Sequence, residues 1–211
     1  MMDCKSVSDR GYVRIGCVIM ASGYGRRFGG NKLLADFCGK PLLQWLLDAT
    51  RDVFDDCVVI TRYPEIEKIC QEQNILVVLH DLPNRNDTVR LGLEAIGNNI
   101  DYCMFCPGDQ PLLSRKTIQK MVNLVRQQNH VDDFLRLSYR TRVGTPVIFP
   151  KKYFEELASL SEGKGGSALL KKYPEKVCLF PAGNEFELLD VDCPTDLERL
   201  KKHHLRFCQK S

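Results

Sequence analysis

The sequence predicts an α/β fold in which a mostly parallel sheet is covered by helices on both faces. Short, continuous apolar runs rich in β-branched residues alternate with amphipathic segments up to Gln128. Continuous apolar runs are typical of strands buried on both faces, and their alternation with helices is typical of parallel sheets. At 211 residues and 44% hydrophobic content, the chain is also long enough to bury one core of good size.

Strands and helices alternate in order along the first part of the chain. We expect strands at Gly16–Ala21, 56–61, 75–79 and 102–106. We expect helices at 42–50, 63–73, 87–96 and 115–128. Pro41 suits the start of the first helix, Asp87 or Thr88 is the expected cap of the third, and Ser114 is the expected cap of the fourth.

The regular alternation of strands and helices ends after Asn129. Further strands are expected at 134–141, 145–150, 177–183 and 186–192, separated by helical segments at 151–160 and 167–173. No linker rich in Ser, Gly or Pro marks a boundary, so these elements should extend the same sheet with an antiparallel element or a small subdomain. We therefore expect an N-terminal extension at 1–14 and a single domain at 15–205.

Charge balance and hydropathy argue against several classes of protein. The 30 Lys and Arg residues exceed the 27 Asp and Glu residues by only +3, and no run of five like charges suggests an arm for nucleic acid. The N-terminal segment lacks the apolar core of a secretory signal, and no run of eighteen apolar residues could span a membrane. We expect a soluble, cytoplasmic protein that binds neither nucleic acid nor a membrane.

The ten cysteines lie at scattered positions, several of them inside apolar runs. We interpret them as reduced thiols that serve mostly as small core residues. Cys103 and Cys106 form a C-x-x-C pair, which a redox couple or half a zinc site would also use. Residues three apart on a strand point to opposite faces, and no second C-x-x-C or paired histidine motif completes a site. The structural role is therefore favoured.

The segment IMASGYGRRFGGNKLL, which follows the first expected strand, has the composition of a phosphate-binding loop. Glycines allow positive φ angles and close approach to a ligand, and their N–H groups can bind an anion. Arg26, Arg27 and Lys32 add positive charge here. Ligands of open parallel sheets bind beyond the carboxyl ends of the strands, where this loop should lie. The alternative is a flexible surface loop with solvated arginines.

Neither of the common phosphate-binding fingerprints is present in this loop. Phe28 stands where G-x-G-x-x-G requires its third glycine. Gly30 is followed by Asn31-Lys32-Leu33 rather than by Gly-Lys-Ser/Thr. A Rossmann dehydrogenase and a P-loop ATPase are therefore both disfavoured.

Acidic residues follow other expected strands. Asp109, in PGDQPLL, comes shortly after the strand at 102–106, while Asp190 and Asp192 precede Pro194 in LLDVDCPTDLERL. A polyphosphate normally binds together with Mg²⁺, which takes carboxylate ligands. Residues two apart on a strand share a face, so either or both of Asp190 and Asp192 could face the same crevice as Asp109. Turn formation at Asp109 and capping before Pro194 are the alternative roles.

Four motifs, in order, resemble those of the MobA-like nucleotidyltransferase family, particularly its molybdenum cofactor cytidylyltransferases. They are IMASGYGRRFGGNKLL…GKPLL, PGDQPLL, GTPVIF and LLDVDCPTDL, within roughly Ile15 to Leu200. The resemblance implies a Rossmann-like three-layer sandwich of the nucleotide-diphospho-sugar transferase type. It also implies Mg²⁺-dependent transfer of CMP from CTP to the phosphate of a molybdopterin-type cofactor, with release of pyrophosphate. A molybdoenzyme or chaperone that receives the product is the implied partner.

The same resemblance implies roles for individual residues. The nucleotide would lie beside Ala21, Ser22 and Gly23. Its phosphates would contact Gly25, Arg27 and Lys32. Asp109 and Asp192 would hold Mg²⁺, and a contact of Asp190 with the metal stays open. Arg27, Lys32 and Asp109 would be the catalytic residues. Gly108 and Thr88 would complete the nucleotide site, although helix capping explains Thr88 almost as well.

Some residues depart from the family pattern. In SEGKGGSALL, Gly163 and Ser167 stand where similar cofactor-processing sequences often carry an acid and an arginine. The acceptor could therefore be a sugar phosphate or another phosphorylated alcohol. A non-catalytic nucleotide-binding partner in cofactor maturation is the alternative from a different class. The run from Ala21 to Gly23 is nearer the cytidylyl than the guanylyl pattern of the family.

Overall fold

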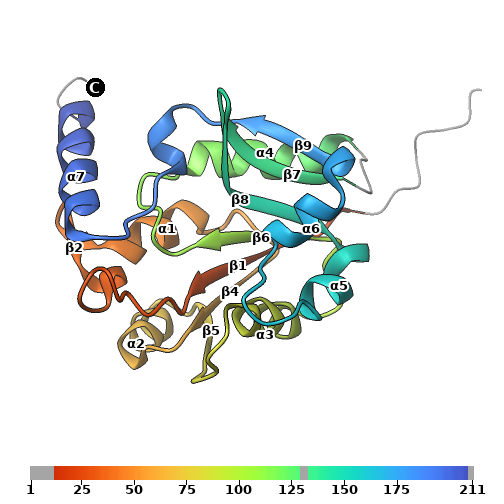
Figure 1. The fold of residues 1–211 in the computed structure, drawn as a ribbon, viewed down its shortest axis with the longest axis horizontal. Helices are drawn as coiled ribbons and strands as arrows, with labels where there is room; N and C mark the ends of the chain where they lie inside the picture. The colour runs from red at the N-terminus through yellow and green to blue at the C-terminus, as the bar shows by residue number, and fades with distance from the viewer. Residues whose placement is uncertain (1–11, 129–132, 209–211) are drawn as a thin grey trace, which may run out of the picture.

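The computed structural model describes residues 12–128 and 133–208, which form a seven-stranded sheet flanked by helices (Figure 1). The strand order is β5-β4-β1-β6-β8-β7-β9. The strands are Ile15–Ala21 (β1), Asp56–Thr61 (β4), Leu76–Leu79 (β5), Tyr102–Pro107 (β6), Phe134–Tyr139 (β7), Arg142–Pro150 (β8) and Val177–Pro181 (β9). A separate small sheet pairs Asp36–Phe37 (β2) with Lys40–Pro41 (β3). Most of the expected extension at 1–14 lies outside the described residues.

The strand directions confirm a mostly parallel sheet with an antiparallel element. Strand β1 pairs in parallel with β4 and β6, and β4 pairs in parallel with β5. Strand β8 is antiparallel to both of its neighbours, β6 and β7, while β9 is parallel to β7. The regular alternation of strands and helices therefore ends where the chain adds the β7–β8 hairpin to the edge of the parallel sheet.

Helices cover both faces of the sheet and give three layers, as expected. The helices are Leu42–Thr50 (α1), Pro64–Glu72 (α2), Arg85–Ile96 (α3), Arg115–Gln128 (α4), Phe154–Ala158 (α5), Ser167–Lys172 (α6) and Pro194–Cys208 (α7). Short 3₁₀ helices span Lys32–Leu34 (η1), Lys151–Tyr153 (η2), Pro174–Lys176 (η3) and Glu185–Leu188 (η4). One core lies between the sheet and α1, α2, α4 and α7, and a second lies between the sheet and α3, α5 and α6.

Successive residues of the central strands enter the two cores alternately. On β1, Cys17 and Ile19 belong to the first core, and Val18 belongs to the second. On β6, Cys106 lies in the first core and Cys103 in the second, so the expected opposite orientation of this C-x-x-C pair is confirmed. The eight cysteines whose side chains are described are free thiols.

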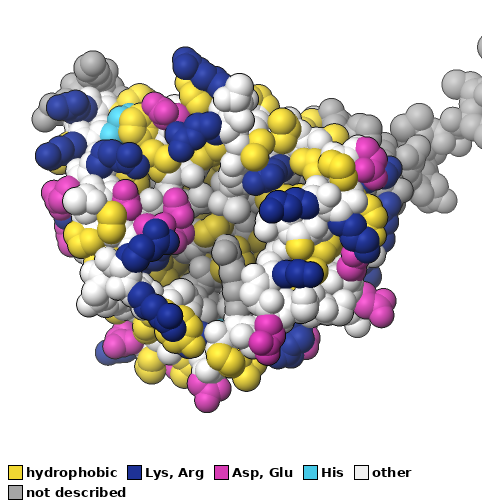
Figure 2. Space-filling view, viewed as in Figure 1, with side chains coloured by type: hydrophobic (Ala, Val, Ile, Leu, Met, Phe, Trp, Pro, Cys, Tyr) yellow, Lys and Arg dark blue, Asp and Glu magenta, His cyan; other side chains and the backbone are white. Residues whose placement is uncertain are grey.

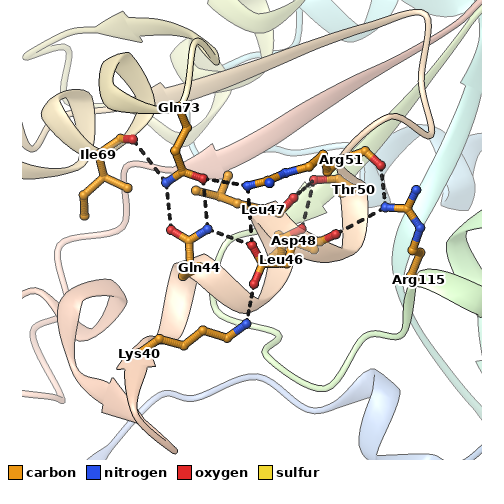
Figure 3. Close-up of polar contacts among 10 residues, drawn as sticks. All are labelled: Lys40, Gln44, Leu46, Leu47, Asp48, Thr50, Arg51, Ile69, Gln73 and Arg115. Carbon is orange, nitrogen blue, oxygen red and sulfur yellow. Dashed lines mark hydrogen bonds and ion pairs between the residues drawn. The ribbon is translucent and has the colours of Figure 1, made fainter.

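A polar network links α1 to neighbouring elements on the face of the sheet that α1, α2, α4 and α7 cover (Figure 3). Gln44 of α1 and Gln73, at the end of α2, exchange hydrogen bonds of 3.0 and 2.8 Å between their amide groups. Asp48 of α1 accepts from Gln44 and pairs with Lys40. Arg115, the first residue of α4, donates to the carbonyl of Arg51 just after α1. These contacts tie α1 to β3, to the end of α2 and to the start of α4.

The register of the central strands brings three loops to one edge of the sheet. Ala21 of β1 lies beside Thr61 of β4, and Met20 lies beside Pro107 of β6. The N–H of Gly108 still donates to the carbonyl of Met20, at 2.9 Å, so the loop after β6 begins against β1. The glycine-rich loop and the loop that carries Asp109 therefore leave the sheet side by side.

Two sequence expectations are wrong in detail. Helix α3 begins at Arg85, and its N-cap residue is Asn84 rather than Asp87 or Thr88. Asp87 lies inside the first turn, and its carboxylate accepts a hydrogen bond from the Asn84 N–H at 3.1 Å. The segment 186–192 is not a strand but η4 followed by extended chain. Buried Glu187 accounts for this, because its carboxylate accepts from the N–H groups of Gly183 and Ser114 and holds the turn.

Over the described part of the chain, none of the helices combines the length and the apolar character that crossing a membrane requires.

Asp55 joins the start of β1 to α4 at the opposite edge of the sheet. Its carboxylate accepts from the N–H of Ile15 at 2.7 Å and from Arg126 of α4 at 2.9 Å. Burial disfavours the charged form, but these bonds and one with Tyr12 outweigh burial and lower the pKa of Asp55 below its ordinary value. A carboxyl with a lowered pKa stabilises the fold above its unfolded pKa, about 3.9, and loses that contribution as the pH falls through the folded value.

We expect Asp55→Asn to lower the free energy of unfolding at pH 7 by about 1–3 kcal/mol, because Arg126 loses a charged partner. Urea denaturation measures the effect, and the difference from the parent protein should shrink between pH 7 and pH 3. Asp56→Asn is the matched control, since the ion pair of Asp56 with Arg14 is exposed and should contribute under about 1 kcal/mol. A deficit of the same size at both pH values would contradict this explanation.

Candidate active site

A cleft of about 620 Å³ opens at the carboxyl edge of β1, β4 and β6. Its lining comes from the glycine-rich loop, the end of β4, the start of α3, the loop after β6 and the segment before α7. The residues are Met20, Ser22, Gly23, Tyr24, Gly25, Arg26, Arg27, Lys32, Leu33, Arg62, Pro83, Asn84, Thr88, Pro107, Asp109, Asp190 and Asp192. Figure 2 shows a hollow near the middle of this face with Lys and Arg side chains around its rim.

The glycine-rich loop folds into a tight turn that side chains would prevent. Gly25 has a φ of +60°, and a Cβ there would lie 2.1 Å from the carbonyl oxygen of Gly30. The carbonyl of Gly25 accepts from the N–H groups of Phe28 and Gly29, at 2.9 and 3.1 Å. Gly29 also has a positive φ, +81°. Only glycine fits at Gly25, so the turn depends on that residue.

Residues at the end of β4 hold this loop in place. The Nε of Arg62 donates to the Ser22 carbonyl at 2.7 Å, and its guanidinium lies 3.8 Å from the centre of the Tyr24 ring. The hydroxyl of Tyr63 donates to the carbonyl of Gly23 at 2.7 Å. Arg62, Tyr63 and Tyr24 are not among the residues expected from the sequence. Arg62 and Tyr63 could have been identified by their position, because they directly follow a strand at the edge of the sheet where ligands bind.

Ser22 is buried and linked to His80, which follows β5. The Ser22 hydroxyl donates to the Ile60 carbonyl at 3.0 Å, and 2.7 Å separates its Oγ from His80 Nε2. Since the hydroxyl proton is used, Nε2 of His80 is the donor, and its buried Nδ1 has no partner among the described residues. Burial lowers the pKa of His80, and the charge of Arg62 lowers it further. Neutral imidazole therefore positions Ser22.

Lys32 forms the centre of the charged part of the cleft. Its ammonium lies 2.6 Å from the Asp109 carboxylate and 3.3 Å from that of Asp192, and the side chain is only 11% exposed. Burial disfavours the charged form of Lys32, yet the two carboxylates outweigh it and raise the pKa above the ordinary value. Arg27, on the exposed side, contacts the other oxygen of Asp192 at 2.9 Å. The expected cations and carboxylates thus meet in one place.

Three carboxylates in this cluster offer ligand atoms for a metal ion. One oxygen each of Asp109, Asp190 and Asp192 lies within 4.8 Å of the other two. Burial raises the pKa of Asp190, and the neighbouring Asp109 carboxylate raises it further. The Oδ1 atom of Asp109 is buried with no hydrogen-bond partner in the described part of the chain. Clustered carboxylates with an unpartnered buried oxygen fit a hard divalent cation, which prefers oxygen ligands.

Most of the residues proposed from the sequence line the cleft. They are Ser22, Gly23, Gly25, Arg27, Lys32, Thr88, Asp109 and Asp192. Ala21 and Gly108 are not among the lining residues. Ala21 is fully buried, with its carbonyl accepting from the Thr61 hydroxyl at 3.0 Å, and a Cβ at Gly108 would lie 3.1 Å from Leu43. Contact of these two residues with a nucleotide stays a prediction.

Comparison with known proteins gives a family match and several more distant relatives. The family model described as the MobA-like NTP transferase domain matches residues 17–177. A probable molybdenum cofactor guanylyltransferase from Natranaerobius thermophilus is 28% identical over 118 residues, covering 54% of this chain and 56% of that protein. A 2-C-methyl-D-erythritol 4-phosphate cytidylyltransferase from Aquifex aeolicus is 28% identical over 215 residues, covering 88% of this chain and 95% of that protein.

The matched regions span only part of several relatives. For the first three curated relatives, they cover 24%, 56% and 48% of those proteins. Among solved structures, Rv0371c from Mycobacterium tuberculosis H37Rv has a TM-score of 0.79 at 24% identity, with 90% of this chain and 99% of that one covered. Another structure of Rv0371c is described as a complex with manganese. These likenesses establish the fold.

We expect Lys32→Gln to lower the free energy of unfolding by about 1–3 kcal/mol, because the carboxylates of Asp109, Asp190 and Asp192 lose their buried cation. Millimolar Mg²⁺ or Mn²⁺ should raise the unfolding temperature of this variant more than that of the parent protein, and EDTA should abolish the difference. Lys40→Gln is the control, since Lys40 pairs with Asp48 outside the cleft. An equal response of both variants to the metals would contradict metal binding at the cluster.

Proposed function

Because this chain belongs to the MobA-like NTP transferase family, we propose that it is a nucleotidyltransferase that moves CMP from CTP to the phosphate of a molybdopterin-type cofactor and releases pyrophosphate. The observation that carries this proposal is the pairing of Lys32 with Asp109 and Asp192, with Asp190 beside these two carboxylates, at a glycine-lined cleft. Cations to bind phosphates and carboxylates to bind Mg²⁺ are the two requirements for joining two anionic substrates.

In this mechanism the glycine-rich loop binds the triphosphate. The open backbone at Gly23 and the turn at Gly25 let phosphate oxygens approach the loop, and Lys32 offsets their charge. Arg27 is 75% exposed, so its guanidinium is free to turn from Asp192 toward a phosphate at little cost in desolvation. The phosphate of the acceptor then attacks the α-phosphorus; the new P–O bond forms as the bond to pyrophosphate breaks.

The carboxylates Asp109 and Asp192 would hold Mg²⁺, and Asp190 is close enough to join them. Bound Mg²⁺ would stabilise the negative charge that develops on the phosphate oxygens. The residues themselves need no covalent intermediate, because their role is to position two phosphates and to offset charge. Ser22, fixed by His80, and Thr88 at the start of α3 would contact the ribose or base.

The choice of CTP and of acceptor rests on fewer residues. The run Ala21-Ser22-Gly23 favours cytidine, and one relative is named a cytidylyltransferase while another is named a guanylyltransferase. A sugar phosphate or another phosphorylated alcohol is the alternative acceptor, and the departures at Gly163 and Ser167 favour this alternative. With a molybdopterin acceptor, the product would pass to a molybdoenzyme or its chaperone.

A panel of CTP, GTP, ATP and UTP with Mg²⁺ tests the proposal. Each nucleotide is offered with molybdopterin, with 2-C-methyl-D-erythritol 4-phosphate and without acceptor, and pyrophosphate release is measured. We expect release to require Mg²⁺ and an acceptor, and to be fastest with CTP. Nucleotide binding without release under any of these conditions would instead favour the non-catalytic binding partner.

We expect Asp109→Asn to lower kcat for pyrophosphate release at least about a hundredfold while the fold is retained, because the proposed metal site loses a charged ligand. Circular dichroism checks the fold of the variant. Asp52→Asn is the matched control: Asp52 is exposed just after α1, at the opposite edge of the sheet, and its positive φ of 56° suits asparagine. Near-normal release by a folded Asp109→Asn protein would refute the assigned role.

A further inference from the structure

Arg136 of β7 is a half-buried charge inside an apolar row of the sheet. Its register partner on β8 is Val147, which pairs in turn with Phe105 of β6, and Phe105 pairs with Val18 of β1. Val18, Phe105 and Val147 are buried members of the second core. Residues directly opposite one another share a face of the sheet, so Arg136 continues this row on the face covered by α3, α5 and α6.

The guanidinium of Arg136 has no acidic partner among residues 12–128 and 133–208. Its Nε donates to the carbonyl of Gly144 at 3.0 Å, and its terminal nitrogens form no ion pair with a described residue. Burial lowers the pKa of Arg136, and no opposite charge counters this effect. Arg126 is different, because Asp55 lies 2.9 Å from it. A half-buried cation without a counter-charge costs free energy unless an anion binds to it.

The side chain of Arg136 leans toward the edge of the sheet at which the cleft opens. Gly144, its hydrogen-bond partner, lies three residues before Val147 on β8, toward the β7–β8 turn. Because β8 is antiparallel to β6, this end of β8 extends toward the carboxyl edge of β6. Figure 2 shows Lys and Arg side chains on the rim of the hollow over β8 and α6 as well as on the opposite rim.

Strand spacing sets the separation between Arg136 and the nucleotide half of the cleft. Three steps in the sheet, β1 to β6 to β8 to β7, separate the two strands. At 4.7–4.9 Å a step, β7 lies about 14 Å from β1. Measured across the sheet alone, a molecule that reacts at the end of β1 and reaches Arg136 would carry its second group roughly 10 Å from its reacting phosphate, allowing for the length of the arginine side chain.

We propose that Arg136 binds a second anionic group of the acceptor, at the end remote from its reacting phosphate. This inference rests on the proposed function for the identity of the ligand as an acceptor, but the anion site itself does not. The acceptor class is a phosphorylated molecule that carries a carboxylate, a second phosphate or a similar acidic group roughly 10 Å from its reacting phosphate. Arg136 is then a specificity-determining residue, since acceptors without that group leave its charge unpaired.

The first experiment tests the anion site without turnover. The side-chain Nε–H signal of Arg136 is followed by NMR during titration with inorganic phosphate, with Arg136→Met used to assign it. We expect a saturable shift. The signal of Arg142, an exposed arginine on the same hairpin assigned with Arg142→Met, should drift only with ionic strength. No shift at Arg136, or a drift parallel to that of Arg142, would overturn the proposal.

The second experiment tests acceptor specificity. The parent protein is given ω-carboxyalkyl phosphates and alkyl phosphates of matched length, with CTP and Mg²⁺, and kcat/KM is measured from pyrophosphate release. We expect the carboxylate series to be favoured about tenfold or more at the length that spans the gap. Arg136→Met should reduce this ratio to near one, Arg136→Lys should keep part of it, and Arg142→Met should keep all of it.

The outcomes separate this inference from the proposed function. An unchanged preference for the carboxylate in a folded Arg136→Met protein would overturn the role in specificity. The parent protein could instead show a saturable phosphate shift at Arg136 but turn over none of the acceptors. That result would refute the proposed function and support the anion site. A structural role confined to the Gly144 hydrogen bond would produce neither the shift nor the change of ratio.

Discussion

The charged cluster at Lys32 is the constraint on which the candidate site depends. Asp109 and Asp192 are close enough to Asp190 for one metal ion to touch all three, so their charges repel one another unless a cation lies between them. The ammonium of Lys32 does so at 2.6 and 3.3 Å. Lys32 follows β1, Asp109 follows β6, and Asp192 precedes α7. One electrostatic balance therefore ties three distant parts of the chain together at the edge of the sheet.

The fold could be predicted from the sequence wherever local pattern and burial agree. The apolar runs of β1 and β6 are continuous because both faces of these strands are buried, and the pattern alone identifies them. The segment 186–192 alternates apolar and acidic residues, as a half-buried strand would, but it forms the end of η4 followed by extended chain. There, Glu187 turns inward and bonds to Gly183 and Ser114, which lies 73 residues away. No local pattern contains a contact of that range.

Most residues that line the cleft could be predicted from the sequence, but the contacts among their side chains could not. Arg27, Lys32 and Asp109 were identified from loops that follow strands, and the parallel sheet brings such loops to one edge. Asp192 was expected at the end of a strand before a helix, and its proposed role came from the family motif. The sequence could not reveal that Lys32 and Arg27 pair with the carboxylates themselves, since that depends on side-chain geometry. It also missed Arg62, whose part is to hold the Ser22 carbonyl and cover Tyr24. Such supporting residues carry no motif of their own.

Buried Lys32 and half-buried Arg136 differ in their counter-charges, and this difference bears on the order of binding. Lys32 already has counter-charges, so a phosphate can gain its full attraction only once the carboxylates have another cation to neutralise them. Under the proposed function, a divalent metal that binds with the nucleotide would supply that cation, and the binding of metal and of triphosphate would then be coupled. Arg136 has no described acidic partner and needs no such exchange. If both proposals hold, the charge pairing of Lys32 would favour cooperative binding of metal and nucleotide, and Arg136, which has no described acidic partner, would favour independent binding of an anion.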